Sequence, residues 1–136
     1  MSPRTVDFDD EFPSVSGIPR GVLVLFGPGG PMGTQVTFAE ALIDTGAMHT
    51  MLPEDAAENI GIDLSTSQTV TISTANGALD VRYDLVDLEL QGIACNQVGV
   101  YFGPGGSLDL IGRSTIYRAC ESLGLTDAEW LRKSHQ

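Results

Sequence analysis

The tripeptide Asp44-Thr45-Gly46 is the sequence feature that most constrains the fold of this chain. It directly follows the short apolar segment Ala41-Leu42-Ile43. This order predicts a buried strand that delivers a carboxylate to a tight turn, where glycine permits backbone conformations that other residues avoid. A carboxylate at the end of an apolar strand is costly unless it is hydrogen-bonded, paired or used in chemistry. An ordinary strand-to-turn junction has the same composition, so the tripeptide alone leaves both interpretations open.

Length and charge narrow the class of protein. The chain has 136 residues and a formal net charge of −11, a length expected for one domain with its own core. The negative charge makes nucleic acid and anionic membrane surfaces unfavourable partners. No segment approaches the roughly 18 apolar residues of a transmembrane helix, and the N-terminus lacks the apolar core of a signal peptide. We therefore expect a cytoplasmic protein with no membrane segment.

The cysteine and histidine residues predict no metal site. Cys95 and Cys120 lie far apart and fit no metal-ligand spacing, so buried free thiols are the simpler interpretation. His49 and His135 cannot form a histidine-based metal site by themselves. We expect no metal and no cofactor.

Short apolar and β-branched segments separated by turn residues predict a mainly β fold. Strands are expected at residues 21–26, 35–38, 41–43, 69–73, 79–83, 85–90 and 98–102, with another apolar run at 108–112.

Three short helices are expected between or after these strands. Pro53 and Gly61 bound the first, at residues 53–60; Ser114 caps the second, which runs to about Leu123; and the third carries Trp130 and Leu131. Residues 1–20 are rich in Pro, Ser and Asp and are expected to form a flexible arm, which leaves residues 21–136 as the folded domain.

The segment Phe-Gly-Pro-Gly-Gly occurs twice, at residues 26–30 and 102–106. Each copy precedes a Leu-Ile pair, at residues 42–43 and 110–111. The separations differ, so chance similarity of turn composition and a duplicated half both remain open. Glycine-rich segments can also cradle a phosphate, but neither copy ends in the Lys-Ser/Thr of a phosphate-binding loop, and the net charge opposes anions.

Three segments, in order, resemble the retropepsin-like aspartic proteases, the single-domain type found in retroviruses and in cellular relatives. The first is Leu42-Ile43-Asp44-Thr45-Gly46-Ala47, with Thr50 and Leu52 where that family carries Ser or Thr and an apolar residue. The second is Thr74-Ala75-Asn76-Gly77, which is similar to the tip of the family's flap. The third is Leu110-Ile111-Gly112-Arg113, similar to the segment before its C-terminal helix. The resemblance covers roughly residues 20–124.

The resemblance implies a small, closed, barrel-like β domain with a flap hairpin and short helices, and it implies a homodimer. Peptide hydrolysis needs a base to activate water and an acid to protonate the leaving nitrogen, and two adjacent carboxylates that share one proton supply both, as aspartic proteases are known to do. One Asp-Thr-Gly supplies only half of this pair. Asp44 of each subunit would therefore meet its counterpart on a two-fold axis. Thr45 would lock the two turns together, and Gly46 would let substrate approach closely.

The resemblance also implies a set of residues that contact a peptide or protein substrate. Ala47 and Met48 would line the cleft, the hairpin tip would close over the substrate, and Ile111 would pack beneath the catalytic turn. The complete set is Ala47, Met48, Thr74, Ala75, Asn76, Gly77 and Ile111. A plain structural β-turn remains the alternative for the hairpin tip, because Asn-Gly turns are common.

The chain departs from the retroviral pattern at Met48. Retroviral members often carry an acid there, paired with the arginine that follows Ile-Gly, so Arg113 has lost that partner. The loss of the acid predicts a preference for apolar substrates. The leading hypothesis is an active aspartic endopeptidase, and the alternative is a non-catalytic dimeric peptide-binding domain on the same fold.

Overall fold

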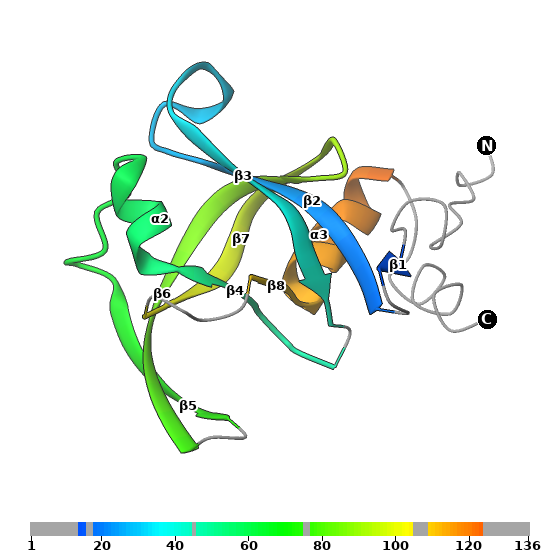
Figure 1. Cartoon of the computed structure of the whole chain (residues 1–136). Helices are drawn as coiled ribbons and strands as arrows, with labels where there is room; N and C mark the ends of the chain where they lie inside the picture. The colour runs from blue at the N-terminus through cyan, green and yellow to red at the C-terminus, as the bar shows by residue number, and fades with distance from the viewer. Residues whose placement is uncertain (1–13, 16–17, 45, 75–76, 105–108, 124–136) are drawn as a thin grey trace.

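The computed structural model describes residues 14–15, 18–44, 46–74, 77–104 and 109–123, and Figure 1 shows how the elements are arranged. Their bounds are β1 Ser14–Val15, β2 Ile18–Phe26, η1 Gly30–Met32, β3 Gln35–Ile43, β4 Thr50–Pro53, α2 Glu54–Asn59, β5 Gln68–Thr74, β6 Gly77–Leu90, β7 Ile93–Gly103, β8 Leu110–Ile111 and α3 Arg113–Leu123. The predicted mainly β class is confirmed.

The strands form one sheet in the order β1-β2-β3-β8-β4-β7-β6-β5, and a further pairing of β2 with β6 closes six of them into a ring. The pairs β3–β8 and β4–β7 are parallel. β8 therefore lies between β3 and β4, the two strands that the Asp44 turn connects. β5 and β6 form a hairpin that extends away from the ring toward the lower left of Figure 1.

Alternation along the strands directs apolar side chains into one core. On β7, Val98, Val100 and Phe102 are buried, whereas Tyr101 between them is only partly buried. The same core takes further side chains from β2, β6 and α3, namely Leu23, Leu25, Leu88, Leu90, Ile116 and Ala119. Each fully buried side chain of this size contributes about 1.5–3 kcal/mol to folding. The core thus fixes the ring that carries the turn at Asp44.

In two places, two predicted strands are joined into a single strand. The segments predicted at 35–38 and 41–43 are joined as β3. The segments predicted at 79–83 and 85–90 are joined as β6, because Asp84 stays in the strand. Its carboxylate accepts a hydrogen bond from the Ser67 hydroxyl at 2.9 Å and another from the Leu85 amide at 2.8 Å.

The start of the sheet lies within the predicted arm. β1 pairs with the beginning of β2, and β2 begins at Ile18, three residues before the predicted strand. The division of the chain into an arm at residues 1–20 and a domain at 21–136 stays a prediction.

The first predicted helix is α2, with small differences at its ends. It begins at Glu54, and Pro53 is the capping residue rather than the first helical one. Gly61 follows the helix at a φ of +91°, a left-handed conformation that favours glycine, as predicted for its C-terminal end.

The second predicted helix is α3, and it begins at Arg113, two residues earlier than a cap at Ser114 would place it. The predicted capping role of Ser114 is therefore wrong. Its hydroxyl instead donates to the Gly99 carbonyl oxygen at 3.1 Å and accepts from the Thr50 amide at 3.3 Å. The third predicted helix, with Trp130 and Leu131, lies outside the described residues. In the part of the chain that the structure describes, no helix is long and apolar enough to span a membrane.

The two Leu-Ile pairs of the sequence lie beside each other in the sheet. Leu42 pairs with Leu110, and Ile43 with Ile111, in parallel register. The preceding Phe-Gly segments also occupy similar places, because Phe26 ends β2 and Phe102 lies one residue before the end of β7.

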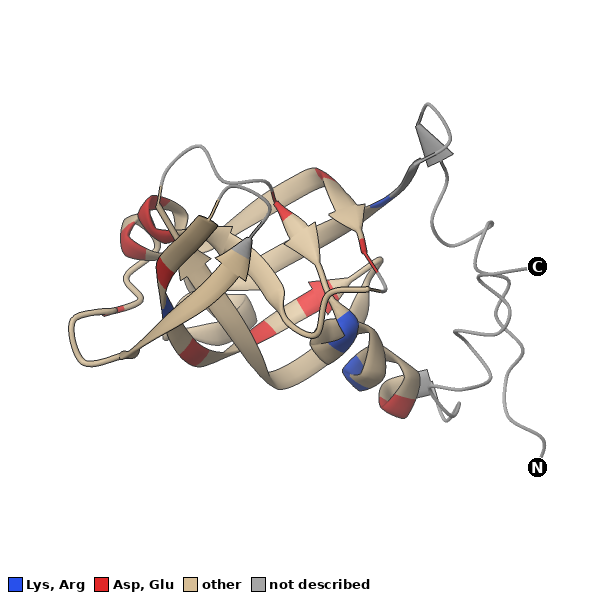
Figure 2. Cartoon of the chain, turned by 90° about the horizontal axis from the view of Figure 1, so that it is seen from below, with Lys and Arg blue, Asp and Glu red and all other residues tan. Residues whose placement is uncertain are grey.

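Charge is distributed unevenly over the fold. Figure 2 shows acidic residues on α2 and along several strands, while α3 carries the two basic residues Arg113 and Arg118. Arg118 pairs with Glu121 at 3.1 Å on the exposed surface of α3. Such an exposed pair contributes only about 0–1 kcal/mol.

Candidate active site

Asp44 follows the last residue of β3, in the turn that the sequence predicts. Its amide donates to the Ile111 carbonyl oxygen of β8 at 3.0 Å, and its Oδ1 accepts from the Gly46 amide at 2.9 Å. The Ala47 amide then donates to the Asp44 carbonyl oxygen at 3.2 Å. An aspartate that bonds the amide two residues ahead stabilises a tight turn. The partly buried carboxylate is thus hydrogen-bonded, as its position after an apolar strand requires.

The loop after Asp44, described at residues 46–49, is hydrogen-bonded to the beginning of α3. The amides of Arg113 and Ser114 donate to the carbonyl oxygens of Ala47 and Met48, each at 2.9 Å. The first amides of a helix have no acceptor within the helix, so here the loop supplies it. The loop therefore keeps a defined position relative to β8 and α3.

Gly112 allows this close approach. A β-carbon at Gly112 would come within 2.5 Å of the carbonyl carbon and oxygen of His49, and within 3.0 Å of the Ala47 carbonyl oxygen. Only glycine fits there without movement of the backbone.

The predicted substrate-contacting residues differ in exposure. Gly46 is exposed and Ala47 partly buried, while the Met48 side chain is 61% exposed. Ile111 is fully buried and pairs with Ile43, so it supports the turn from below. The contact of these residues with a substrate stays a prediction.

Part of the predicted site lies outside the described residues, namely Thr45, Ala75 and Asn76. Thr74 pairs with Gly77 across the end of the β5–β6 hairpin, and Gly77 has a φ of +111°. The predicted hairpin is present, and Gly77 is the first residue of β6.

An aromatic cluster beside the loop was not foreseen from the sequence. The ring of His49 lies 4.6 Å from that of Tyr101 and 5.7 Å from that of Tyr83, measured between centroids. Burial lowers the pKa of His49 from its ordinary value, which favours the neutral ring. A hollow of about 330 Å³ opens beside the cluster, between α3 and strands β6 and β7. The only signal in the sequence was that both tyrosines occupy outward-facing positions of strands in which apolar and polar residues alternate.

Two charged residues, Arg113 and Asp109, lie close to β8 in the sequence. The Nε of Arg113 is buried, and it has no hydrogen-bond partner among the described residues. Burial raises the pKa of Asp109, just before β8. Within the described segments, no group of three or more His, Cys, Asp or Glu side chains is placed to hold a metal ion.

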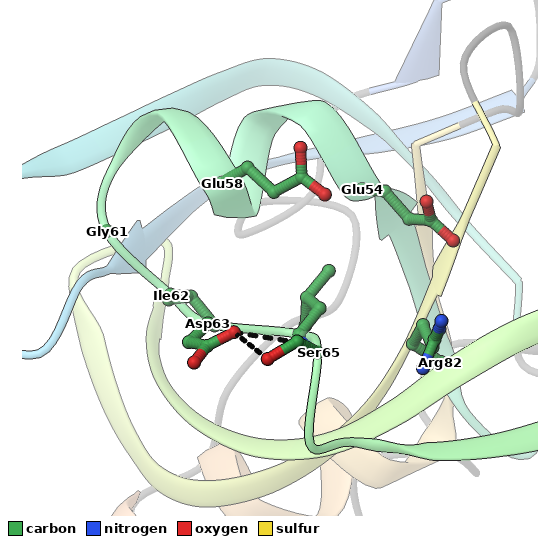
Figure 3. A pocket seen from close by; sticks show the side chains of 8 residues that line it. Glu54, Glu58, Gly61, Ile62, Asp63, Ser65 and Arg82 are labelled. Atoms are coloured by element: carbon green, nitrogen blue, oxygen red, sulfur yellow. Dashed lines mark hydrogen bonds between the residues drawn. The ribbon is translucent and has the colours of Figure 1, made fainter.

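A larger hollow, of about 530 Å³, lies between α2 and β6 and is drawn in Figure 3. Glu54 and Arg82 lie at one side of it, and Asp63 and Ser65 at another. The Ser65 hydroxyl and amide donate to Oδ1 of Asp63 at 2.6 and 2.9 Å, which lowers the pKa of Asp63. The described residues among 44–49 do not line this hollow, so its size alone does not make it part of the candidate site.

Comparison with known families decides which kind of protein carries this turn. Residues 32–115 match the family described as aspartyl protease. The chain belongs to the aspartyl protease family. The matched range includes Asp44, the β5–β6 hairpin and the Ile111-Gly112 segment, and the family predicted from the sequence is confirmed. A comparison with curated proteins found no match.

Proposed function

We propose that the protein is a retropepsin-like aspartic endopeptidase whose active site forms between two copies of the chain. One observation carries the proposal: Asp44 stands in a turn bonded to β8 and to α3, in a chain that matches the aspartyl protease family. The sequence has a single Asp-Thr-Gly, so a second carboxylate has to come from a second copy.

The proposed reaction is hydrolysis of a peptide bond by water held between the two Asp44 carboxylates. One carboxylate takes a proton from the water as the water attacks the peptide carbonyl carbon, and the other gives its proton to the leaving nitrogen. Two such groups at close range do not both ionise readily, so they share one proton in the resting dimer. Thr45 of the two copies would tie the turns together, and Gly46 would allow the substrate to approach.

The exposure of the loop supports assembly with a second copy. Gly46 is exposed, and the Met48 side chain is 61% exposed. A peptide on one subunit would thus rest on an open surface. A second subunit and the two β5–β6 hairpins would enclose it and exclude water.

The proposed substrates are peptides with apolar side chains beside the scissile bond. Met48 offers a thioether where retroviral members often offer a carboxylate, and thioethers adapt to varied apolar shapes. Cleavage of a peptide library, read by mass spectrometry, checks this preference. A strong requirement for Lys or Arg next to the cleaved bond would contradict it.

The decisive experiment compares the wild-type protein with Asp44→Asn in the same library. The substitution keeps the shape of the side chain and removes the shared proton, so we expect the cleavage rate to fall at least about 1,000-fold. Asp63→Asn is the matched control, because Asp63 is an exposed carboxylate away from the loop, and it should cleave at the wild-type rate.

Two results would reject parts of the proposal. Cleavage by Asp44→Asn at the wild-type rate would remove Asp44 from the reaction. Binding of peptides by the wild-type protein without any cleavage would favour the non-catalytic peptide-binding domain. Sedimentation equilibrium measures the fraction of dimer at each protein concentration. The cleavage rate per chain should rise with that fraction.

A further inference from the structure

Thr50 and Thr115 are fully buried polar residues directly beneath the Asp44 loop. Thr50 begins β4 and Thr115 lies in the first turn of α3, and both have 0% exposure. Burying a hydroxyl without a hydrogen bond costs about 1–3 kcal/mol, so an apolar pair would be the simpler way to fill this space. The two hydroxyl groups solve the problem by bonding to each other, with 2.5 Å between their oxygens.

The Thr50 hydroxyl has a second bond that links the pair to the catalytic turn. Its oxygen accepts from the Gly112 amide at 3.0 Å. That amide belongs to the same peptide group as the Ile111 carbonyl, which accepts from the Asp44 amide at 3.0 Å. A single planar peptide group is therefore held by Asp44 on one side and by Thr50 on the other.

This arrangement makes a continuous chain of hydrogen bonds from Thr115 through Thr50 and the 111–112 peptide group to Asp44. Hydrogen bonds in such chains polarise and strengthen one another in a buried setting. Because a peptide group turns as a rigid unit, loss of the acceptor for its N–H also frees the carbonyl that holds the Asp44 amide. The two buried hydroxyl groups thus influence the position of the Asp44 backbone through the 111–112 peptide group.

We propose that Thr50 and Thr115 are positioning residues that set the orientation of the 111–112 peptide group and, through it, the placement of the Asp44 carboxylate. The proposal rests on the proposed endopeptidase function. Two carboxylates that share a proton need close and reproducible placement, since small displacements of a reacting group are costly. The pair touches no substrate, so it acts on the chemical step rather than on binding.

The test uses Thr50→Val and Thr115→Val, which keep the shape and remove one hydroxyl each. Thr50→Val leaves the Gly112 amide without its acceptor, and we expect kcat to fall about 10- to 100-fold with KM changed less than about twofold. Thr115→Val leaves that acceptor in place, and we expect a smaller fall of about three- to tenfold. The double variant should be no slower than Thr50→Val, because both act through one chain of bonds.

Two further variants separate positioning from general stability. Thr115→Ser keeps the hydroxyl and should retain at least half of the wild-type kcat. Ser122→Ala is the matched control: it removes a hydroxyl from the same helix, where Ser122 bonds the Ala94 carbonyl oxygen, and it should leave kcat unchanged. Equal losses in Ser122→Ala and Thr115→Val, or no recovery in Thr115→Ser, would overturn the proposal.

Amide hydrogen exchange supplies a measurement that does not depend on activity. The Asp44 and Gly112 amides should exchange at least about tenfold faster in Thr50→Val, and measurably faster in Thr115→Val, with no change in Ser122→Ala. If Thr50→Val does not fold, Thr115→Val decides, because it keeps the acceptor of Gly112. Unchanged exchange at Asp44 in folded variants would reject the pair as positioning residues. A wild-type protein that cleaves nothing would instead reject the proposed function, and the exchange rates would still report on the pair.

Discussion

The phenol ring of Tyr83 lies on the backbone of Gly99, where a β-carbon would come within 2.9 Å of two ring carbons. Tyr83 is on β6 and Gly99 on β7, and Tyr83 also pairs across the strands with Tyr101. Because Gly99 has no side chain, the Tyr83 ring has room to lie on its backbone. This contact supports the aromatic cluster next to the loop that follows Asp44.

Substitution of Gly99 tests that contact. Gly99→Ala should lower the free energy of unfolding by about 1–3 kcal/mol, because the added methyl group overlaps the Tyr83 ring. Urea denaturation measures the change. In Tyr83→Ala the ring is gone, so the same glycine substitution should cost less than half as much, and equal costs in the two backgrounds would contradict the proposed overlap.

Gly112 should tolerate substitution less than a glycine in open space. Gly112→Ala would bring its methyl group within 2.5 Å of the His49 backbone, and we expect a loss of about 2–4 kcal/mol together with loss of cleavage activity. Gly30 is the comparison, since it has a φ of +64° but nothing within 4 Å. Gly30→Ala should cost about 1–2 kcal/mol through backbone strain alone and should keep full activity. A milder effect at Gly112 than at Gly30 would show that the loop is not held against α3.

The unfolding free energy should depend on pH through His49. Burial lowers its pKa in the folded protein below the ordinary value of 6.5. Between the two pKa values the unfolded chain binds more protons than the folded one, so this contribution is present above about pH 6.5 and is lost as the pH falls. As the pH falls from 8 to 5, the unfolding free energy of the wild type should therefore decrease relative to that of His49→Phe. A difference that stays constant over this range, while His135→Phe behaves as wild type, would exclude His49 as the source.

The thiol of Cys95 should be unreactive in the folded protein. Burial raises its pKa to about 12, so almost no thiolate forms at pH 8.5. Ellman's reagent should label Cys95 in a Cys120→Ala variant only after unfolding. The same pKa predicts that stability falls by about 1.4 kcal/mol per pH unit above pH 9, because the unfolded thiol ionises there and the folded one does not. Cys95→Ala should lack this slope, and rapid labelling of the native thiol would contradict its burial.

The sequence predicted those strands whose pattern is local. The alternation that buries Val98, Val100 and Phe102 was visible in the letters alone. The continuity of β6 was not, because Asp84 resembles a break until Ser67, far along the chain, is seen to donate a hydrogen bond to it. Side-chain partners that come from other strands cannot be inferred from propensity.

The turn at Asp44 could be predicted from the sequence, whereas its hydrogen-bond partners could not. Asp44 and the segment at Ile111 were chosen from resemblance to a family, since no periodicity relates positions so far apart. The cluster of His49, Tyr83 and Tyr101 was missed because it depends on the register between β6 and β7 and on the position of His49 just before β4. The cap predicted at Ser114 failed for a similar reason, since the hydroxyl is used by β4 and β7 rather than by its own helix.

The placement of β8 between β3 and β4 has a consequence for the order of events during synthesis. The Gly112–Thr50 and Thr50–Thr115 bonds join positions 62 and 65 residues apart, so the support of the Asp44 turn is completed by residues that are synthesised late. A nascent chain that has left the ribosome only as far as the β5–β6 hairpin carries Asp44 without its scaffold. Completion of this support would then wait for translation of α3, and under the proposed function cleavage of peptides would begin only after the ring has closed.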